Sequence, residues 1–266
     1  MTAFRHPAYD ELRPVTRLAT VLLARNPGPM TLDGTNTWLL RAPYQSAVVV
    51  VDPGPADERH LALIASAGTV SEILLTHGHP DHSAGARRLH EITGASVRAA
   101  DPAHRFGGEG LGEGDVIDAA GVQMRVWATP GHTADSLSFV LTADDDQRVA
   151  VLTGDTILGR GTTVVAYPDG NLADYLHSLR RLRELGDAVV LPGHGPELSA
   201  VGIAAQSYLD HRQDRLAHVR AAVLALGKGA TPQAVVERVY ADVDRALWPA
   251  AELSVRAQLD YLAQDR

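Results

Sequence analysis

The sequence predicts a layered α/β protein followed by a helical C-terminal part, and two observations support this prediction. Up to Pro196, short apolar runs rich in β-branched residues alternate with helix-like patterns. Strands mixed with helices are typical of sheet and helix layers around a shared core. After Pro196 the pattern becomes mostly helical. We therefore expect a catalytic domain over 1–204 and a helical extension over 205–266.

The predicted strands are short and end in turn residues. An early strand covers 18–24 (LATVLLA), and five more follow at 46–55, 71–78, 122–131, 148–155 and 187–195. The stretch at 18–24 is too short to cross a bilayer and runs on without a small-residue cleavage pattern. We therefore interpret it as a strand and expect a cytoplasmic protein with no membrane partner.

The predicted helices have recognisable ends. Gly94 and Gly186 close the patterns at 84–94 and 172–186, and a further helix is predicted at 56–68. In the extension, a long amphipathic pattern from about 202 to 226 precedes a helix that Thr231 caps, and a third covers 250–264. The long helix must bury an apolar stripe against something, so a homodimer is one expectation.

Composition and charge exclude several kinds of chemistry. The 266 residues include no cysteine, which rules out disulfides, thiolate metal sites and a cysteine nucleophile. The formal net charge of −8 argues against non-specific binding of polyanions, which needs a basic face. Any metal must therefore bind to nitrogen and oxygen ligands, and any site for an anion must be local.

Histidines and aspartates gather at the ends of four predicted strands, in the motifs THGHPDH (76–82), TPGHT (129–133), TGDT (153–156) and PGHG (192–195). Loops fixed at the ends of strands are where functional groups are usually placed. Any one of these histidines alone would more simply be a polar turn residue. Five histidines and two aspartates in such positions together favour a shared metal site.

The spacing in the first of these motifs suits metal binding. Side chains two positions apart in an extended segment point the same way, so His77 and His79 can bind one ion. Asp81 and His82, on the following turn, then face a neighbouring ion. We expect the other motifs to supply the remaining ligands, namely His132, His194 and a bridging Asp155.

In this order and spacing, the four motifs resemble the ligand set of the metallo-β-lactamase fold superfamily, over residues 15 to 200. The resemblance implies a four-layered αββα sandwich with the site at one edge of its two sheets. It also implies an assignment of ligands: His77, His79 and His132 on a first zinc ion, Asp81, His82 and His194 on a second, and Asp155 between them.

Finer motifs resemble the subgroup called β-lactamase-like protein two, whose animal members are described as single-stranded RNA endonucleases. They are NPGPMTLDGTNTWLL (26–40), LGRGTTVV (158–165), LPGHGPEL (191–198) and YLDHRQDR (208–215). The subgroup also carries a winged-helix-like C-terminal extension, which agrees with the helical tail. Because the sequence ends at Arg266, directly after the third predicted helix, we expect an extension without a wing hairpin.

Such a centre would activate water. Zinc lowers the pKa of bound water from 15.7 to about 7, so a bridging hydroxide nucleophile is available at neutral pH. Asp81 can also orient this hydroxide or accept a proton, so Asp81 and Asp155 are the candidate catalytic residues. Histidine and carboxylate ligands also accept Mn²⁺, Fe²⁺ or Ni²⁺ in place of Zn²⁺.

Further residues have two open interpretations. Asp52 either holds a ligand imidazole by its second nitrogen or is an ordinary turn aspartate. By resemblance, four residues lie near the site, where they contact substrate or only form hairpin and loop structure: Asn36, Thr162, Thr163 and Tyr167. Arg160 and Arg212 could meet a phosphate or carboxylate, although arginines in loops and on helices are usually solvated.

Two enzyme functions remain in competition. The subgroup motifs favour phosphodiester cleavage in single-stranded RNA, whereas the acidic charge and the wingless tail favour a small ester, thioester or lactone. A β-lactamase is disfavoured, since the cysteine-free lactamases lack the bridging aspartate that Asp155 provides. A non-enzymatic binding module is weaker still, because no ligand is lost. We predict a dinuclear-zinc hydrolase of a small ester or thioester, with endoribonuclease as the alternative.

Overall fold

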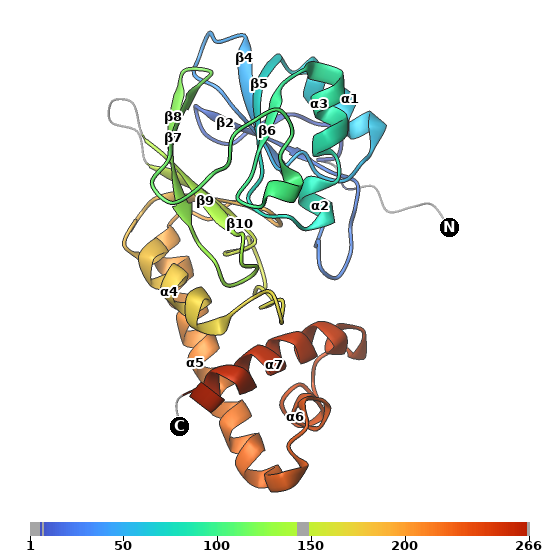
Figure 1. Ribbon diagram of the computed structural model, residues 1–266, viewed down its shortest axis with the longest axis vertical. Coiled ribbons are helices and arrows are strands. Elements are labelled where there is room, and N and C mark those ends of the chain that lie inside the picture. Colours follow the sequence, from blue (N-terminus) through green and yellow to red (C-terminus); the bar gives the residue numbers. More distant parts are fainter. Residues whose placement is uncertain (1–5, 7, 143–148, 265–266) are drawn as a thin grey trace.

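The computed structural model describes residues 6, 8–142 and 149–264, and within them two sheets pack face to face (Figure 1). The first has six strands in chain order: β1 (Arg13–Pro14), β2 (Ala19–Leu23), β3 (Asn36–Leu40), β4 (Ala47–Val51), β5 (Thr69–Leu74) and β6 (Ser96–Arg98). The second has five, in the order β11 (Val189–Pro192), β10 (Ala150–Gly154), β9 (Leu137–Leu141), β8 (Val122–Ala128) and β7 (Val116–Ala119). Both sheets mix parallel and antiparallel pairs.

Helices cover the outer face of each sheet. α1 (Glu58–Ser66) and α3 (Ala86–Thr93) share an apolar cluster with the first sheet that includes Leu61, Ile73 and Leu89. α4 (Leu172–Arg183) and α5 (Val201–Leu226) pack on the second sheet. Between the sheets lies a third cluster, with Trp38 and Phe139 at its centre. The predicted four-layered αββα sandwich is confirmed.

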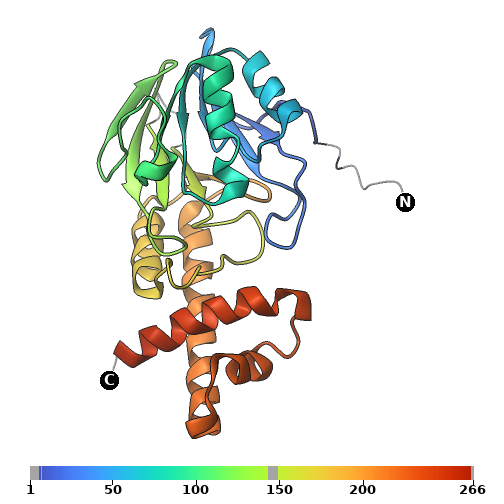
Figure 2. The ribbon, with the colours of Figure 1, turned by 45° about the vertical axis from the view of Figure 1, so that its right-hand side comes forward.

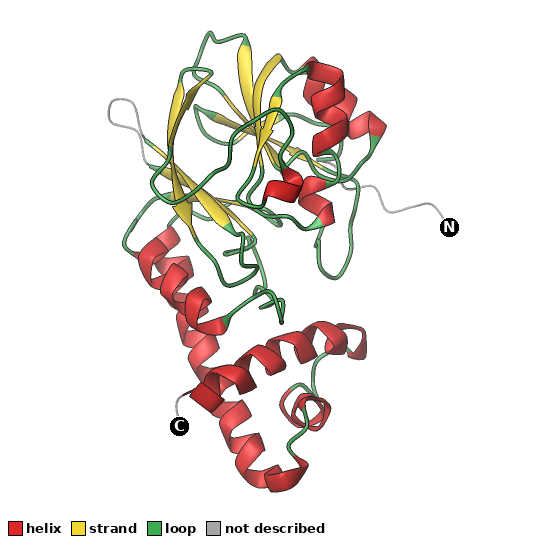
Figure 3. Cartoon of the chain, viewed as in Figure 1, coloured by secondary structure: helices red, strands yellow, loops and turns green. Residues whose placement is uncertain are grey.

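The C-terminal extension is helical. α5 runs past the sandwich, and α6 (Pro232–Val239) and α7 (Trp248–Gln264) pack against its far half (Figures 1 and 2). Thr231 caps α6 by accepting a hydrogen bond from the backbone N–H of Ala234, as its position in the sequence predicts. Between β11 and Gln264 the structure contains no strand, so the wing is absent from this described part (Figure 3).

Most elements lie where the sequence predicts them. β2, β4, β5, β8, β10 and β11 occupy the predicted strands, and α1, α3, α4, α5, α6 and α7 the predicted helices; residue 148 of one predicted strand lies outside the described residues. α5 begins at Val201, so the boundary expected at 204/205 falls inside its first turn and stays a prediction. Among the described residues, no helix combines the length and apolar character needed to cross a membrane.

Candidate metal centre

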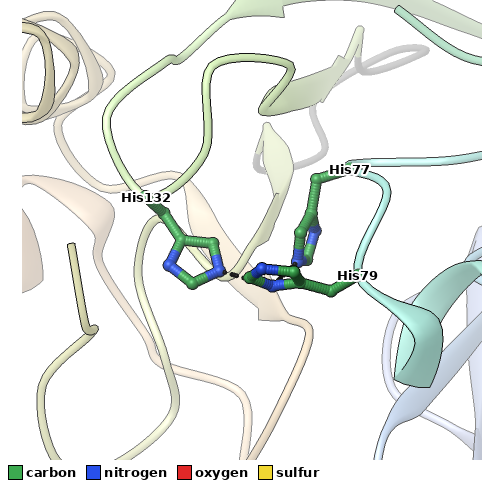
Figure 4. A group of neighbouring side chains, drawn as sticks. All are labelled: His77, His79 and His132. Carbon is green, nitrogen blue, oxygen red and sulfur yellow. Dashed lines mark hydrogen bonds between the residues drawn. The ribbon is translucent and has the colours of Figure 1, made fainter. Parts of the chain in front are cut away.

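Four loops at one edge of the sandwich carry the candidate ligands. The first links β5 to α2 (Pro80–Ser83), in which Pro80 occupies the first helical turn and His79 the N-cap position. The second joins β8 to β9, and the last two follow β10 and β11. Figure 4 shows His77, His79 and His132 pointing toward one another from two of these loops. Seven side chains from four loops thus meet at one place.

Three imidazole nitrogens form the first cluster. His79 Nδ1 lies 3.0 Å from His77 Nε2 and 3.1 Å from His132 Nε2 (Figure 4). Two nitrogens bound tetrahedrally to one zinc ion at 2.0 to 2.1 Å would lie about 3.3 Å apart. The spacing of the three histidines therefore fits a shared ion with only small movements.

A second cluster lies beside the first. His194 Nε2 is 3.0 Å from Asp81 Oδ2 and 3.1 Å from His82 Nε2. Asp155 stands between the clusters: its Oδ1 is 3.4 Å from His82 Nε2, and its Oδ2 is 3.8 Å from His132 Nε2. Asp155 Oδ1 is buried without a hydrogen bond to any described residue. A buried carboxylate oxygen without a donor fits a cation as its partner.

Asp52 holds the imidazole of His82 in place from outside the two clusters. Its Oδ2 lies 2.9 Å from His82 Nδ1, and its two oxygens also accept hydrogen bonds from the backbone N–H and the hydroxyl of Thr76, at 2.8 and 2.7 Å. With Nδ1 engaged in this way, the Nε2 atom of His82 is directed into the cluster. Asp52 is therefore more than a turn residue.

Backbone carbonyls orient two further histidines. His132 Nδ1 lies 2.6 Å from the carbonyl oxygen of Val164, and His194 Nδ1 lies 3.1 Å from that of Gly34. A carbonyl can only accept, so each Nδ1 carries a proton, and the neutral form of each ring has its lone pair on Nε2. This tautomer is the one that binds a metal through Nε2.

Gly193 lets the last loop approach the centre closely. A Cβ atom at this position would lie 2.5 Å from Asp155 Oδ1 and 2.7 Å from His82 Cε1. Both distances are far below van der Waals contact, so only glycine leaves these side chains where they are. The residue before His194 is thus part of what shapes the site.

Burial and neighbouring charges together set the protonation states of the side chains in the two clusters. Burial lowers the pKa of His77 and His132, which favours the neutral imidazoles that bind metals. Burial alone would also lower the pKa of His194, yet Asp155 and Asp81 raise it to about 9. Against its own burial, Asp155 has a pKa held well below its usual range by His194 and His82. Its carboxylate is therefore ionised at neutral pH.

The other predicted residues divide into loop-forming and cavity-lining groups. Asn36 donates to the carbonyl oxygens of Pro192 and Gly195, at 3.0 and 2.8 Å, and so holds the loop of His194. Thr163 is buried and donates to the carbonyl of Asp155 at 2.7 Å. Tyr167 lies apart, in a hollow against α7.

A cavity of about 330 Å³ opens beside the metal centre. Its wall includes His132, Asp155 and four of the predicted residues, Thr162, Thr163, Arg160 and Arg212. The extension closes its far side with residues that sequence reasoning did not single out: His211, Arg215, Tyr240, Val243 and Leu247. Arg215 follows Arg212 by three positions in the YLDHRQDR motif, and that helical spacing was the available signal, whereas no pattern in the sequence indicated His211.

Two family models match the chain. The model described as "Metallo-beta-lactamase superfamily" matches residues 30–194, which include all seven candidate ligands. The chain belongs to the metallo-beta-lactamase superfamily. A second model, "Beta-lactamase associated winged helix domain", matches residues 231–266 and confirms the winged-helix-like extension. Members of this superfamily with thioesterase names are hydrolytic enzymes, and this chain is a metallo-hydrolase of the same family.

Curated relatives match most of the length of this chain. It is 33% identical to a "Beta-lactamase-like protein 2 homolog" from Caenorhabditis elegans, over 97% of this chain and 90% of that protein. It is 34% identical to an "Atrochrysone carboxyl ACP thioesterase" from Aspergillus fumigatus, over 79% of this chain and 65% of that protein. The first match supports the predicted subgroup.

Solved structures share the fold. A Beta-lactamase domain protein from Burkholderia ambifaria is 25% identical with a TM-score of 0.79, over 99% of this chain and 91% of that chain. Another structure, of a protein in a di-iron-bound form, is 26% identical with a TM-score of 0.56, over 70% of this chain and 98% of that chain. The extension is thus part of the likeness to the first structure.

Proposed function

We propose that this metallo-hydrolase holds two zinc ions and cleaves a thioester or another small ester. The position of Asp155 between two clusters of three ligands supports a dinuclear centre most directly. One ion would bind His77, His79 and His132, the other Asp81, His82 and His194, with Asp155 reaching both. Fe²⁺ or Mn²⁺ fits the same nitrogen and oxygen donors.

The protein's own residues would divide the work of hydrolysis. When bound, the zinc ions would polarise the scissile carbonyl and lower the pKa of a water molecule to about 7. Asp155 stays ionised because His194 and His82 keep its pKa low. Against its own burial, Asp81 has a pKa held well below its usual range by His194 and His82, so this partly exposed carboxylate stays ionised and can orient the attacking water by accepting a hydrogen bond.

Three observations support a small thioester substrate. The cavity beside the centre has apolar side chains over much of its wall, including Met30, Leu158 and Leu247, which suits an acyl chain. The relative from Aspergillus fumigatus is named a thioesterase. The net charge of −8 also suits a small substrate better than a polyanion.

Cleavage of single-stranded RNA is the second candidate. The match of residues 231–266 to the winged-helix family model favours it, because winged helices commonly bind nucleic acids. Within the described part of that extension, however, no strand forms a wing. Partner binding through α5, including a homodimer, stays a prediction.

One experiment separates the candidates. Zinc-loaded protein is assayed side by side on acyl thioesters, lactones, a β-lactam and a fluorescent single-stranded RNA, with Asp155→Ala as the control. We expect thioester turnover that is lost in the control. RNA cleavage without thioester turnover, again lost in the control, would replace this proposal with the nuclease, and activity that persists in the control would come from a contaminant.

A further inference from the structure

Arg212 is a buried cation that has no acidic partner among the described residues. It lies on α5, its residue is 3% exposed, and its Nε forms no hydrogen bond with any described residue. No described carboxylate lies within 4.0 Å of its guanidinium nitrogens, the distance within which other arginines of this chain meet theirs. A buried charge that is left uncompensated is destabilising. Arg212 therefore needs an anion that the described chain does not supply.

The visible contacts of Arg212 hold it in place without neutralising it. One NH₂ group donates to the carbonyl oxygen of Thr163, and the guanidinium lies 5.2 Å above the ring centre of the fully buried Tyr175. Both contacts fix the direction of the side chain at the wall of the cavity. A planar guanidinium fixed in this way is well suited to carboxylate or phosphate oxygens.

Arg215 adds a second positive charge to the same wall. It follows Arg212 by three positions, so both lie on one face of α5. Its NH1 donates to the carbonyl of Val239 at 3.2 Å, and its guanidinium lies 4.8 Å above the ring centre of Tyr240. Among the described residues no carboxylate pairs with it. Of the described residues that line the wall, Asp155 alone is acidic, and it already faces the histidines of the metal centre.

Much of the remaining wall of the cavity is apolar. Met30, Leu32, Val243 and Leu247 contribute to it, and His132 marks the end at the metal centre. A ligand that fills this cavity would therefore meet the metal centre, an apolar surface and a pair of arginines. Non-specific RNA binding needs an extended basic surface instead, whereas Arg212 is buried and Arg215 is half-buried at the wall of this one cavity.

We propose that Arg212 and Arg215 bind an anionic group, a carboxylate or phosphate, on an otherwise apolar thioester substrate and so select anionic substrates over neutral ones. This inference rests on the function proposed above. The negative group would lie at α5, with the apolar body between it and the metal centre. The anion could belong to the acyl part or to the thiol part of the thioester.

Matched substrates test this selectivity. Glutaryl and pentanoyl thioesters of N-acetylcysteamine differ by a carboxylate on the acyl part, and pentanoyl thioesters of phosphopantetheine and pantetheine differ by a phosphate on the thiol part. We expect kcat/KM to be higher for the anionic member of at least one pair by about 10-fold to 100-fold, as for hydrogen bonds to charged groups. The pair that shows the preference identifies the source of the anion.

Two variants and a control assign the preference to the arginines. Both variants are checked for folding by circular dichroism and for zinc content. Arg215→Gln, which removes one charge, should bring the ratio of anionic to neutral turnover close to one, and Arg212→Lys, which keeps the charge but loses the planar fork, should lower it. Arg220→Gln changes an exposed arginine of the same helix outside the cavity and should leave the ratio unchanged. A wild-type ratio near one in both pairs, or a ratio that both variants retain, would overturn the proposal.

A measurement of ligand binding tests the anion site separately from the enzymatic function. Calorimetric titration of the zinc-loaded protein compares glutarate with pentanoate, and inorganic phosphate with buffer alone. Glutarate or phosphate binding that weakens about tenfold or more in Arg215→Gln would support the anion site even if no thioester is cleaved. If neither glutarate nor phosphate binds, and single-stranded RNA binds through Arg212 and Arg215 instead, the proposal fails in favour of the nuclease.

Discussion

Asp52 Oδ2 lies 2.9 Å from His82 Nδ1, and both side chains are almost completely buried. The contact ties the end of β4 to the turn that carries His82 and Asp81. A carboxylate behind a histidine fixes the tautomer and raises the affinity of the opposite nitrogen for a metal. The relationship therefore links a residue outside the centre to metal binding.

Asp52→Asn should weaken metal binding without unfolding the protein. Asn removes the negative charge behind His82 yet tolerates the positive φ of 52° at this position. We expect zinc affinity to fall by about 10-fold to 100-fold, as is usual for such supporting residues. Competition with a fluorescent zinc chelator measures this change. Asp118→Asn, at an exposed position of β7, is the matched control, and equal affinities in both variants would contradict the role of Asp52.

His79→Ala should abolish hydrolysis while leaving the fold intact. The substitution removes one of three nitrogens from the first cluster and touches no apolar core. Because a metal contributes several kcal/mol to transition-state stabilisation, we expect kcat/KM to fall by about a thousandfold or more. Steady-state kinetics and metal analysis measure the loss, and circular dichroism checks the fold. His177→Ala, on the exposed face of α4, should behave as wild type. Unchanged turnover in His79→Ala would show that the reaction occurs elsewhere.

Gly193→Ala should disturb the centre through a single methyl group. Its Cβ would overlap Asp155 Oδ1 and His82 Cε1, so both side chains must move. A displacement of about 1 Å in a catalytic group can cost about a hundredfold in rate, and we expect a loss of that order. Gly112→Ala meets no atom within 4 Å and serves as control. A fully active Gly193→Ala enzyme would show that this close approach is dispensable.

His60 gives the protein a defined pH dependence away from the metal centre. Burial lowers its pKa to about 4, while its Nε2 lies 2.9 Å from the hydroxyl of Thr37. The unfolded chain, with a pKa of about 6.5, binds the proton more readily. The contribution of neutral His60 to stability is therefore complete above about pH 6.5 and falls as the pH is lowered toward 4.

Urea unfolding measures this effect. Between about pH 7.5 and pH 5 the wild type should lose about 2 kcal/mol more than His60→Gln, which cannot titrate. Titration of other groups cancels in the comparison of the two proteins. An identical pH dependence in both would mean that His60 is not held neutral by burial.

Local patterns predicted an α/β layered body and a shared metal site at the strand ends, and the family resemblance of the four motifs implied the four layers and the assignment of the seven ligands. Strands with a clear apolar run and a terminal turn, such as β4 and β10, were predicted, whereas β3 and β9 were not. β3 begins at Asn36 directly after a turn-rich stretch, and β9 contains Ser138 although it is entirely buried. The opposite sheet covers one face of each strand and helices cover the other, and no local pattern records these contacts.

The role of Arg212 could not be predicted in the same way. An arginine on an amphipathic helix is usually solvated, and nothing in YLDHRQDR distinguishes the buried Arg212 from an exposed one. Its burial depends on the loop of Thr163 and on α6 and α7 folding back toward α5. These are contacts between segments far apart in the chain. Asn36 is similar, since its partners Pro192 and Gly195 lie on a distant loop.

The position of bound metal tests the central claim most directly. Crystals of the zinc-loaded protein would be measured by anomalous diffraction at the zinc absorption edge. We predict two anomalous peaks, one within about 2.0 to 2.2 Å of donor atoms from His77, His79 and His132, and one at the same distance from those of Asp81, His82 and His194. No peak at these side chains, or zinc bound only elsewhere on the protein, would contradict the account.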